Sequence, residues 1–429
     1  MKIRIENSNI NEKISLKLSD LDVKGREILG LESKPEKFSL LENNIDYSFV
    51  ETNKLITTDV RPEDHMVFIN PGGGDREYPV DAPHWRTISK ANIKASIQTP
   101  TGKDFFYTIN TKGVGYLKPT LKGSNNLDAF DSWNRIDEYE LEGAYGLADK
   151  GDFKNSDGRV MVKANYFLNN GLRTEAYLAI ADLKNVIYKG KKTSIKELQE
   201  TKVIPTRLNV KPQIAQRLLK TNTRIAELKE SDSKRGIELL KNAYEVFNQE
   251  TIDKRLDLLK LDFANPQSAV VYTREFSKRM GKNLAVLQNL GYIGWHLHSA
   301  NITLAAEIVD IGPILPAEDY KDDQEFVKNY NGVMRGVLKD MRDVSYDLKF
   351  LLHSVEKLTG KNLDISELCQ IYLDSFKDGL DQQQLKKNGG FKGEDIINMF
   401  EKISSAVLVE DRSLPSLKHG ADISDWGLD

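Results

Sequence analysis

The spacing of apolar residues changes near residue 165, and this change limits the folds that the chain can adopt. In the first 160 residues, short β-like apolar runs are separated by turn residues, as where residues 66–69 precede a run of glycines. Beyond residue 165, apolar residues recur every three or four positions, which is the period of an α-helix. A β-rich first half followed by a helical second half predicts an α+β fold with two lobes.

Individual elements can be bounded from the same pattern. Residues 105–109 and 114–117 are expected to pair as a β-hairpin across a Lys-Gly turn, and residues 160–163 also have a strand-like pattern. Residues 171–183 are expected to form an amphipathic helix. Three more helices are expected between residues 212 and 261, with breaks near Asp232 and Asn248.

The apolar stripe that begins at Phe276 is expected to end at Gly291, a good C-terminal cap. Further helices are expected over residues 323–404, with breaks near 359–360 and 389–390. Together these boundaries predict a β-rich N-terminal extension over 1–100, a first lobe over 101–205, a helical second lobe over 206–412 and a tail over 413–429.

Composition excludes several classes of protein. The 61 basic and 64 acidic residues give a net charge of −3, which excludes a globally basic nucleic-acid binder, and no nucleic-acid partner is expected. Charged residues follow Met1 at once and no run of about 18 apolar residues occurs, so neither a signal peptide nor a membrane partner is expected. The single cysteine, Cys369, excludes an intramolecular disulfide and is expected to fill the core of a helical stretch. A cytoplasmic location is therefore expected.

The stretch from residue 291 to 313 contains the residues best suited to chemistry. A long helix is expected to end at Gly291, and a polar loop then leads to Asn301. Two short apolar runs, 302–304 and 307–309, are expected to form a hairpin that Asn301 opens and Asp310 closes, so that both side chains emerge at one end. An amide oxygen and a carboxylate are hard ligands of the kind that Mg²⁺ prefers, with nucleotide phosphates completing the shell. Either residue alone could instead simply cap a turn.

Two histidines, His296 and His298, lie in this loop. No third ligand with suitable spacing for zinc lies near them. A structural histidine that orients the loop by hydrogen bonding, and a catalytic or phosphate-facing histidine, both remain open.

Nucleotide binding also needs a cation for the phosphates, and three lysines are candidates. Lys118 ends a short apolar strand, Lys163 follows the apolar run at 160–162, and Lys122 precedes a glycine. Lys118 is the preferred candidate, although a solvent-exposed lysine at an edge strand would have the same pattern. Arg159, in an Asp-Gly-Arg turn, could also reach a phosphate.

Glu175 is placed by the pattern in the first turn of the expected helix over 171–183. The helix dipole stabilises an acidic residue at that position, which is a sufficient structural explanation. The same carboxylate could also pair with the lysine and hold it over the α- and β-phosphates.

Lys118, Glu175, Asn301 and Asp310, in this order along the chain, resemble the protein-kinase-like fold. The resemblance implies that the lysine holds phosphates, that the glutamate fixes the lysine, and that the asparagine and aspartate bind metal. In ordinary kinases an aspartate shortly before the asparagine serves as general base. On that pattern the aspartate position falls on His296.

The sequence is more similar to the selenoprotein O-type family of pseudokinase-like protein adenylyltransferases, which also lacks the usual aspartate. The interval from Asn301 to Asp310 is nine residues, as in that family, and Asp-Ile-Gly-Pro at 310–313 is similar to the family's Asp-aromatic-Gly-Pro. The Asp-Gly-Arg turn at Arg159, upstream of Arg173, is similar to a family segment in which arginines help to bind an inverted nucleotide. Ala300 stands where the family has an acidic residue, and the family's C-terminal Cys or selenocysteine motif is absent.

The resemblance implies a transferase that uses ATP with Mg²⁺ or Mn²⁺ and moves AMP, or else phosphate, to a hydroxyl group of a protein or a small molecule. His296 or His298 would then act as the base. General-base catalysis typically supplies about 10²–10⁴ in rate, so activity could survive without the aspartate. The alternatives are a kinase that transfers the γ-phosphate, a catalytically inactive scaffold that binds a partner through the helices of 212–261 and 323–404, and an unrelated structural protein.

Overall fold

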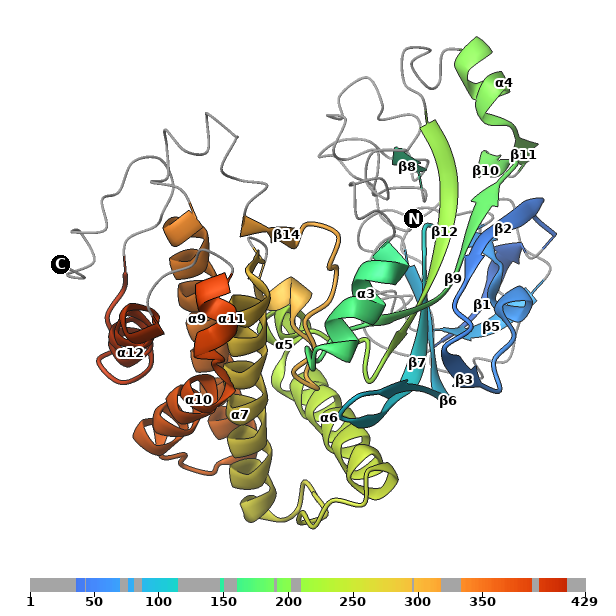
Figure 1. The fold of residues 1–429 in the computed structure, drawn as a ribbon. Coiled ribbons are helices and arrows are strands. Elements are labelled where there is room, and N and C mark those ends of the chain that lie inside the picture. The colour runs from blue at the N-terminus through green and yellow to red at the C-terminus, as the bar shows by residue number, and fades with distance from the viewer. Residues whose placement is uncertain are drawn as a thin grey trace. The chain divides into compact units, whose positions relative to one another are not determined.

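The computed structural model describes residues 36–42, 44–69, 76–80, 87–114, 147–149, 160–188, 191–201, 210–294, 297–317, 333–387 and 393–414. The chain has a mixed α+β fold built around a curled antiparallel sheet, and it divides into two compact units (Figure 1). Neither unit is continuous in sequence. Unit 1 comprises residues 1–98, 104–163 and 176–222, and unit 2 comprises residues 99–103, 164–175 and 223–429.

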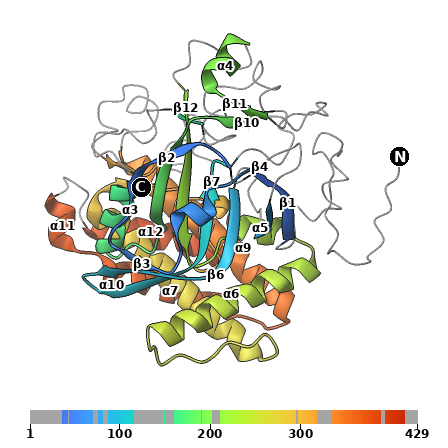
Figure 2. The same cartoon turned by 90° about the vertical axis from the view of Figure 1, so that its right-hand side faces the viewer.

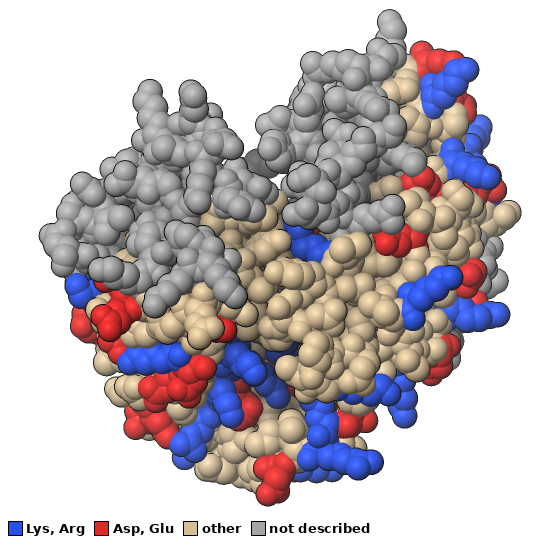
Figure 3. All heavy atoms as spheres, in the orientation of Figure 1, with Lys and Arg blue, Asp and Glu red and all other residues tan. Residues whose placement is uncertain are grey.

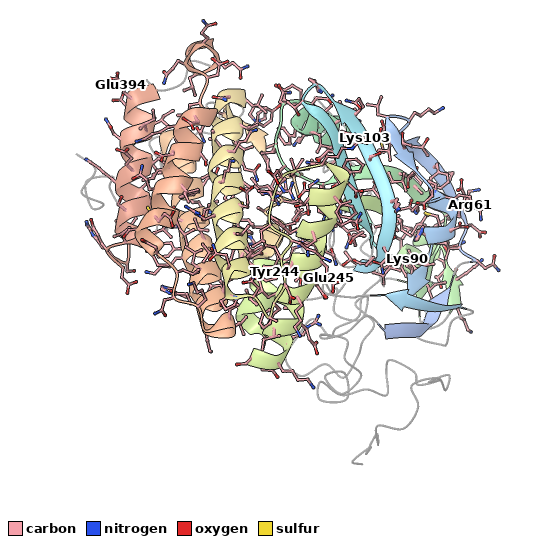
Figure 4. The ribbon with its side chains drawn as sticks, turned by 90° about the horizontal axis from the view of Figure 1, so that it is seen from below. Arg61, Lys90, Lys103, Tyr244, Glu245 and Glu394 are labelled. Atoms are coloured by element: carbon pink, nitrogen blue, oxygen red, sulfur yellow. The ribbon has the colours of Figure 1, made fainter. Side chains whose placement is uncertain are left out.

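Unit 1 is organised by a seven-stranded sheet with the strand order β2-β9-β12-β7-β6-β3 and with β8 paired to β12 (Figures 1 and 2). The strands are β2 (Tyr47–Thr52), β3 (Ile56–Thr58), β6 (Thr87–Thr99), β7 (Gly102–Lys112), β8 (Leu147–Asp149), β9 (Ala176–Leu183) and β12 (Val210–Leu219). The strand expected over 105–109 is confirmed as part of β7. In the sheet, β7 lies between β12 and β6. Figure 4 labels Lys90 on β6 and Lys103 on β7.

Smaller elements complete the described part of unit 1. Strands β4 (Phe68–Ile69), β1 (Glu36–Glu42) and β5 (Arg76–Val80) form a three-stranded sheet, and β10 (Val186–Tyr188) pairs with β11 (Lys191–Thr193). The remaining elements are the 3₁₀ helix η2 (Pro62–His65) and α4 (Ile195–Glu200), whose first turn is capped by Ser194.

The helix expected over 171–183 is wrong, because residues 176–183 form the strand β9. This strand lies inside the sheet between β2 and β12, and seven of its eight residues are buried, including Tyr177 and Leu178 on opposite faces. A strand buried on both faces has a continuous apolar run instead of an alternating one. Such a run also fits one face of a helix, so periodicity alone does not separate the two.

Two neighbouring predictions fail in related ways. Residues 160–163 were expected as a strand but begin the helix α3 (Val160–Asn169), which ends where Gly171 adopts a φ of 85° and Leu172 N–H donates to the Phe167 carbonyl at 3.0 Å. That pattern is a glycine C-cap. Residues 210–219 form the strand β12 and not a helix. The sequence pattern did not predict this strand, because the polar residues Gln216 and Arg217 are buried in it beside apolar residues and obscure the alternation typical of a strand.

Unit 2 is mainly helical. Its helices are α5 (Ile225–Glu230), α6 (Ser233–Asp253), α7 (Pro266–Leu290), α9 (Val333–Thr359), α10 (Ile365–Gly379), α11 (Gln382–Lys387) and α12 (Gly393–Leu408). The expected break at Asp232 is confirmed, since this residue caps α6. The break at Asn248 is wrong, because α6 continues to residue 253.

The end of α7 at Gly291, with a φ of 71°, is confirmed, and so is the end of α9 at residue 359. Gly281 permits a close approach of α7 to α10, because a Cβ there would lie 2.3 Å from the Tyr372 carbonyl oxygen. Cys369 is buried on α10, as expected. Among the described helices, none has the length and apolar character needed to cross a bilayer.

Candidate functional site

The hairpin expected between Asn301 and Asp310 is present in unit 2. Ile302 and Ile308 form an antiparallel bridge, and Ala306 N–H donates to the Thr303 carbonyl at 2.9 Å to close the turn. At the other end, Val309 N–H donates to the Asn301 carbonyl at 2.9 Å. Asn301 and Asp310 therefore lie at the same open end of the hairpin, and both are half-buried.

Residues 173–175 form an extended segment along this hairpin. Thr174 forms a parallel bridge with Ile308, whose N–H donates to the Arg173 carbonyl at 3.0 Å. The Thr174 hydroxyl donates to the Ile308 carbonyl in return. Glu175 thus lies on extended backbone immediately before β9, and its expected position in a first helical turn is wrong.

The Glu175 carboxylate holds the backbone of Asp310. Its Oε1 accepts the N–H of Asp310 at 3.0 Å and lies 3.4 Å from the N–H of Ile311, and Glu175 has no exposed surface. Asp310 has a φ of 59°, in the left-handed region that costs a non-glycine residue conformational energy. The buried carboxylate therefore stabilises the backbone conformation from which the Asp310 side chain extends.

The loop before Asn301 forms a short 3₁₀ helix, η4 (Ser299–Asn301), that begins after His298. His298 is exposed, and its Nδ1 accepts the N–H of Ala300 at 3.3 Å, so a neutral ring carries its proton on Nε2. The carbonyl of His298 accepts the N–H of Asn301 at 2.6 Å. His298 is thus close in the chain and in space to one candidate metal ligand, whereas His296 lies outside the described residues.

Helix α9 supports this loop through groups that the sequence pattern did not single out. Asp340 Oδ2 accepts the N–H of Gly294 at 2.6 Å, and Asp340 is 1% exposed. Asp347 accepts Lys229 Nζ at 2.7 Å and a hydrogen bond from the Ser299 side chain. Burial raises the pKa of Asp347 to about 6, against the lowering effect of Lys229 and Ser299. Acidic residues on the buried face of an amphipathic helix were the signal that could have identified both aspartates.

Arg173 lies at the turn of the hairpin, which is the end opposite Asn301 and Asp310. Its guanidinium donates to both carboxylate oxygens of Glu250, at 2.6 Å each, and its Nε donates to the Ala305 carbonyl at 2.7 Å. These contacts favour a structural role for Arg173 in place of the nucleotide contact expected from the sequence. Glu250, which is 1% exposed, was not singled out because it lies on a helix rich in charged residues.

The candidate phosphate cations are only partly placed. Lys163 is half-buried on α3, in a helix and not in the expected strand. Lys118, Lys122 and Arg159 lie outside the described residues, as do residues 115–117 of the strand expected over 114–117.

The described part of the chain contains no group of three or more His, Cys, Asp or Glu side chains arranged to hold a metal by themselves. A site made by Asn301 and Asp310 would need ligands from phosphate oxygens and water, as is usual for Mg²⁺. On the face shown in Figure 3, the described basic and acidic side chains are interspersed. In comparisons with protein-family models and with curated proteins, the chain matched none.

Proposed function

We propose that the protein is an Mg-ATP-dependent transferase with a two-lobed protein-kinase-like fold, and that it transfers AMP or phosphate to a hydroxyl group of a protein or small molecule. The observation that carries the proposal is the 301–310 hairpin, where an amide and a carboxylate share one end and Glu175 holds the Asp310 backbone. In kinases, an asparagine of the catalytic loop and a following aspartate hold the two magnesium ions in this way. Mn²⁺ could replace Mg²⁺ because it accepts the same oxygen ligands.

The secondary structure of the two units also supports the proposal, because one unit is rich in strands and the other in helices. Unit 1 is built mainly from an antiparallel sheet, and α3 lies between β8 and β9 along the chain, with its residues 164–169 assigned to unit 2. Unit 2 is mainly helical, and its hairpin follows the long helix α7 after the loop that contains η4. A β-rich lobe followed by a helical lobe that carries the metal ligands is the order of a kinase-like chain.

The remaining roles follow from the chemistry of phosphoryl or nucleotidyl transfer. Lys118 is proposed to bind phosphates, with Lys122 and Lys163 as alternatives, and His298 or His296 to accept the proton of the acceptor hydroxyl. Glu175 acts on the metal site through the Asp310 backbone, a role that the sequence did not predict.

The transferred group depends on which phosphorus atom the hydroxyl oxygen attacks. Attack on the α-phosphorus forms a phosphodiester and releases pyrophosphate, whereas attack on the γ-phosphorus forms a phosphomonoester and releases ADP. We favour AMP transfer because the nine-residue interval from Asn301 to Asp310 is similar to that of the selenoprotein O-type family.

The test is to incubate the purified protein with Mg²⁺ or Mn²⁺ and with ATP labelled at either the α- or the γ-phosphate. Label from the α position on protein, lost in Asp310→Ala and Asn301→Ala, is the expected result. Asp257→Asn, an exposed loop aspartate, is the matched control and should keep full activity. Label from the γ position alone would assign the chain as a kinase. Absence of both labels, with no nucleotide-dependent thermal shift, would favour the inactive scaffold.

A further inference from the structure

The β10–β11 hairpin of unit 1 is strongly basic, although the whole chain has a net charge of −3. Residues 183–196, which include both strands, contain no acidic residue and five lysines: Lys184, Lys189, Lys191, Lys192 and Lys196. Lys189 lies outside the described residues, and each of the other four lysines is exposed. In Figure 3, basic side chains lie over β11 and α4 at the upper right of the view. Positive charge is therefore concentrated on one small element of the fold.

Most of this charge is not compensated within the hairpin. Among the described residues, no carboxylate forms an ion pair with Lys184, Lys191 or Lys192. Lys196 lies 3.6 Å from Glu200, one turn later on α4, and both side chains are exposed. Exposed pairs of this kind are weak and are screened by salt. The lysines of the hairpin are therefore available to an acidic partner.

The backbone that carries these lysines is fixed to the rest of unit 1. Val186 and Ile187 of β10 are buried, so the strand is anchored through its apolar side chains. At the base of the hairpin, the Asp46 carbonyl accepts the N–H of Lys184 at 2.8 Å, and the Asp46 carboxylate accepts Asn185 Nδ2 at 2.6 Å. Binding of a partner would therefore order the lysine side chains without first ordering the backbone, which lowers the entropic cost.

The register of the hairpin places lysines on both of its faces. Lys191 pairs with Tyr188, next to the turn at residues 189–190, and Lys192 pairs with Ile187. Consecutive residues of a strand point to opposite faces, so Lys191 and Lys192 flank the end of the ribbon from two sides. The three residue pairs span about 7 Å, which is shorter than the Debye length of about 10 Å at 0.1 M salt, so the lysines reinforce one another's potential. A flexible chain can contact both faces, whereas a flat membrane surface or a rigid duplex contacts only one.

We propose that the β10–β11 hairpin binds a short acidic segment of a partner polypeptide, whose Asp and Glu carboxylates contact Lys191 and Lys192 around the end of the ribbon. Single-stranded nucleic acid fits less well, because its binding usually adds arginine contacts and stacking on several aromatic side chains. Residues 183–196 contain no arginine and one aromatic residue, Tyr188. The net charge of −3 also repels a long polyanion, whereas a short acidic segment contacts only the hairpin. This surface does not depend on the proposed transferase activity.

The experiment measures binding of a fluorescein-labelled peptide of ten glutamates by fluorescence anisotropy in 50 mM NaCl. Wild-type protein should bind this peptide at least tenfold more tightly than a peptide of ten glutamines or a single-stranded DNA of ten nucleotides. The double variant Lys191→Glu and Lys192→Glu should weaken binding of the glutamate peptide at least tenfold. The control is the double variant Lys282→Glu and Lys402→Glu, at exposed positions of α7 and α12, which changes the net charge equally and should bind within twofold of wild type.

A second variant removes the charges without reversing them. Lys191→Gln with Lys192→Gln should weaken binding of the glutamate peptide at least threefold, and it answers the question even if the charge reversal fails to fold. Thermal unfolding of each variant verifies that it is folded. The proposal is overturned if wild type binds both peptides equally, or if the folded hairpin variants bind as wild type or as the control does. It is also overturned if the DNA or vesicles containing phosphatidylserine bind more tightly than the glutamate peptide, because the hairpin would then be assigned to nucleic acid or to a lipid surface.

Discussion

Glu175 is a buried carboxylate whose oxygen is used by the backbone of the residue proposed to bind metal. Its Oε1 accepts the Asp310 N–H at 3.0 Å, and Asp310 has a left-handed φ of 59°. A buried N–H that loses its acceptor costs free energy that an exposed N–H does not. The arrangement therefore links a residue placed early in the chain to the geometry of a site formed more than a hundred residues later.

Replacement of Glu175 by alanine should lower the free energy of unfolding by about 2–3 kcal/mol, because the N–H groups of Asp310 and Ile311 lose their shared acceptor. Glu175→Gln keeps an acceptor oxygen of similar reach and should lose about 1 kcal/mol or less. Urea denaturation measures both values. Equal losses in the two variants would contradict a backbone-anchoring role.

The sequence also predicted Asn301 and Asp310 at one end of a hairpin, and the structure confirms that hairpin. This part was predictable because it depends on contacts between residues fewer than ten positions apart. The anchoring by Glu175, the support from Asp340 and the pairing of Glu250 with Arg173 depend on residues far apart in the chain. Nothing in the local pattern of one sequence shows which distant groups will meet.

At the scale of whole elements, the errors concern segments whose local pattern fits both a helix and a strand. The eight residues of β9 are nearly all buried, and their apolar positions fit either period. Asn248 was expected to break a helix. Its side chain instead accepts the N–H of Leu261 at 2.7 Å and donates to its carbonyl at 2.8 Å, fixing the loop after α6. By contrast, the end of α7 was predicted correctly, because Gly291 provides a strong local C-cap.

Helix α9 should give the protein a measurable dependence of stability on pH through Asp347. Burial raises the pKa of this carboxyl from 3.8 in the unfolded chain to about 6 in the folded one. Between these values the folded state binds the proton more strongly than the unfolded state, so this group's contribution to stability is present at low pH and is lost as the pH rises through 6. The loss is at most about 3 kcal/mol, from roughly 1.4 kcal/mol per pKa unit.

Asp347→Asn should remove this slope, so that the variant is more stable relative to wild type at pH 7 than at pH 4. Urea denaturation at a series of pH values measures the difference. Asp374→Asn, at an exposed position on α10, is the control and should keep the wild-type slope. A slope between pH 4 and 6 that persists in Asp347→Asn would assign the titration to other groups.

At the scale of the whole molecule, the chain passes between the two compact units several times, and neither unit is one continuous segment. Residues 164–175 belong to unit 2, where Arg173 binds Glu250 and Thr174 pairs with Ile308. In unit 1, β12 pairs with β7 and β9, which come from earlier parts of the chain. Each unit is thus completed by segments from both sides of residue 201.

A single backbone cut after Thr201 should therefore leave the two fragments, 1–201 and 202–429, associated. A protease site inserted at this exposed position, at the end of α4, allows the cut to be made in the folded protein. The fragments should elute together in gel filtration and separate only in denaturant, because separation would break the β12 pairings and leave Glu250 buried without Arg173. Elution of fragment 202–429 alone as a compact species would show that the late part of the chain folds without residues 164–175.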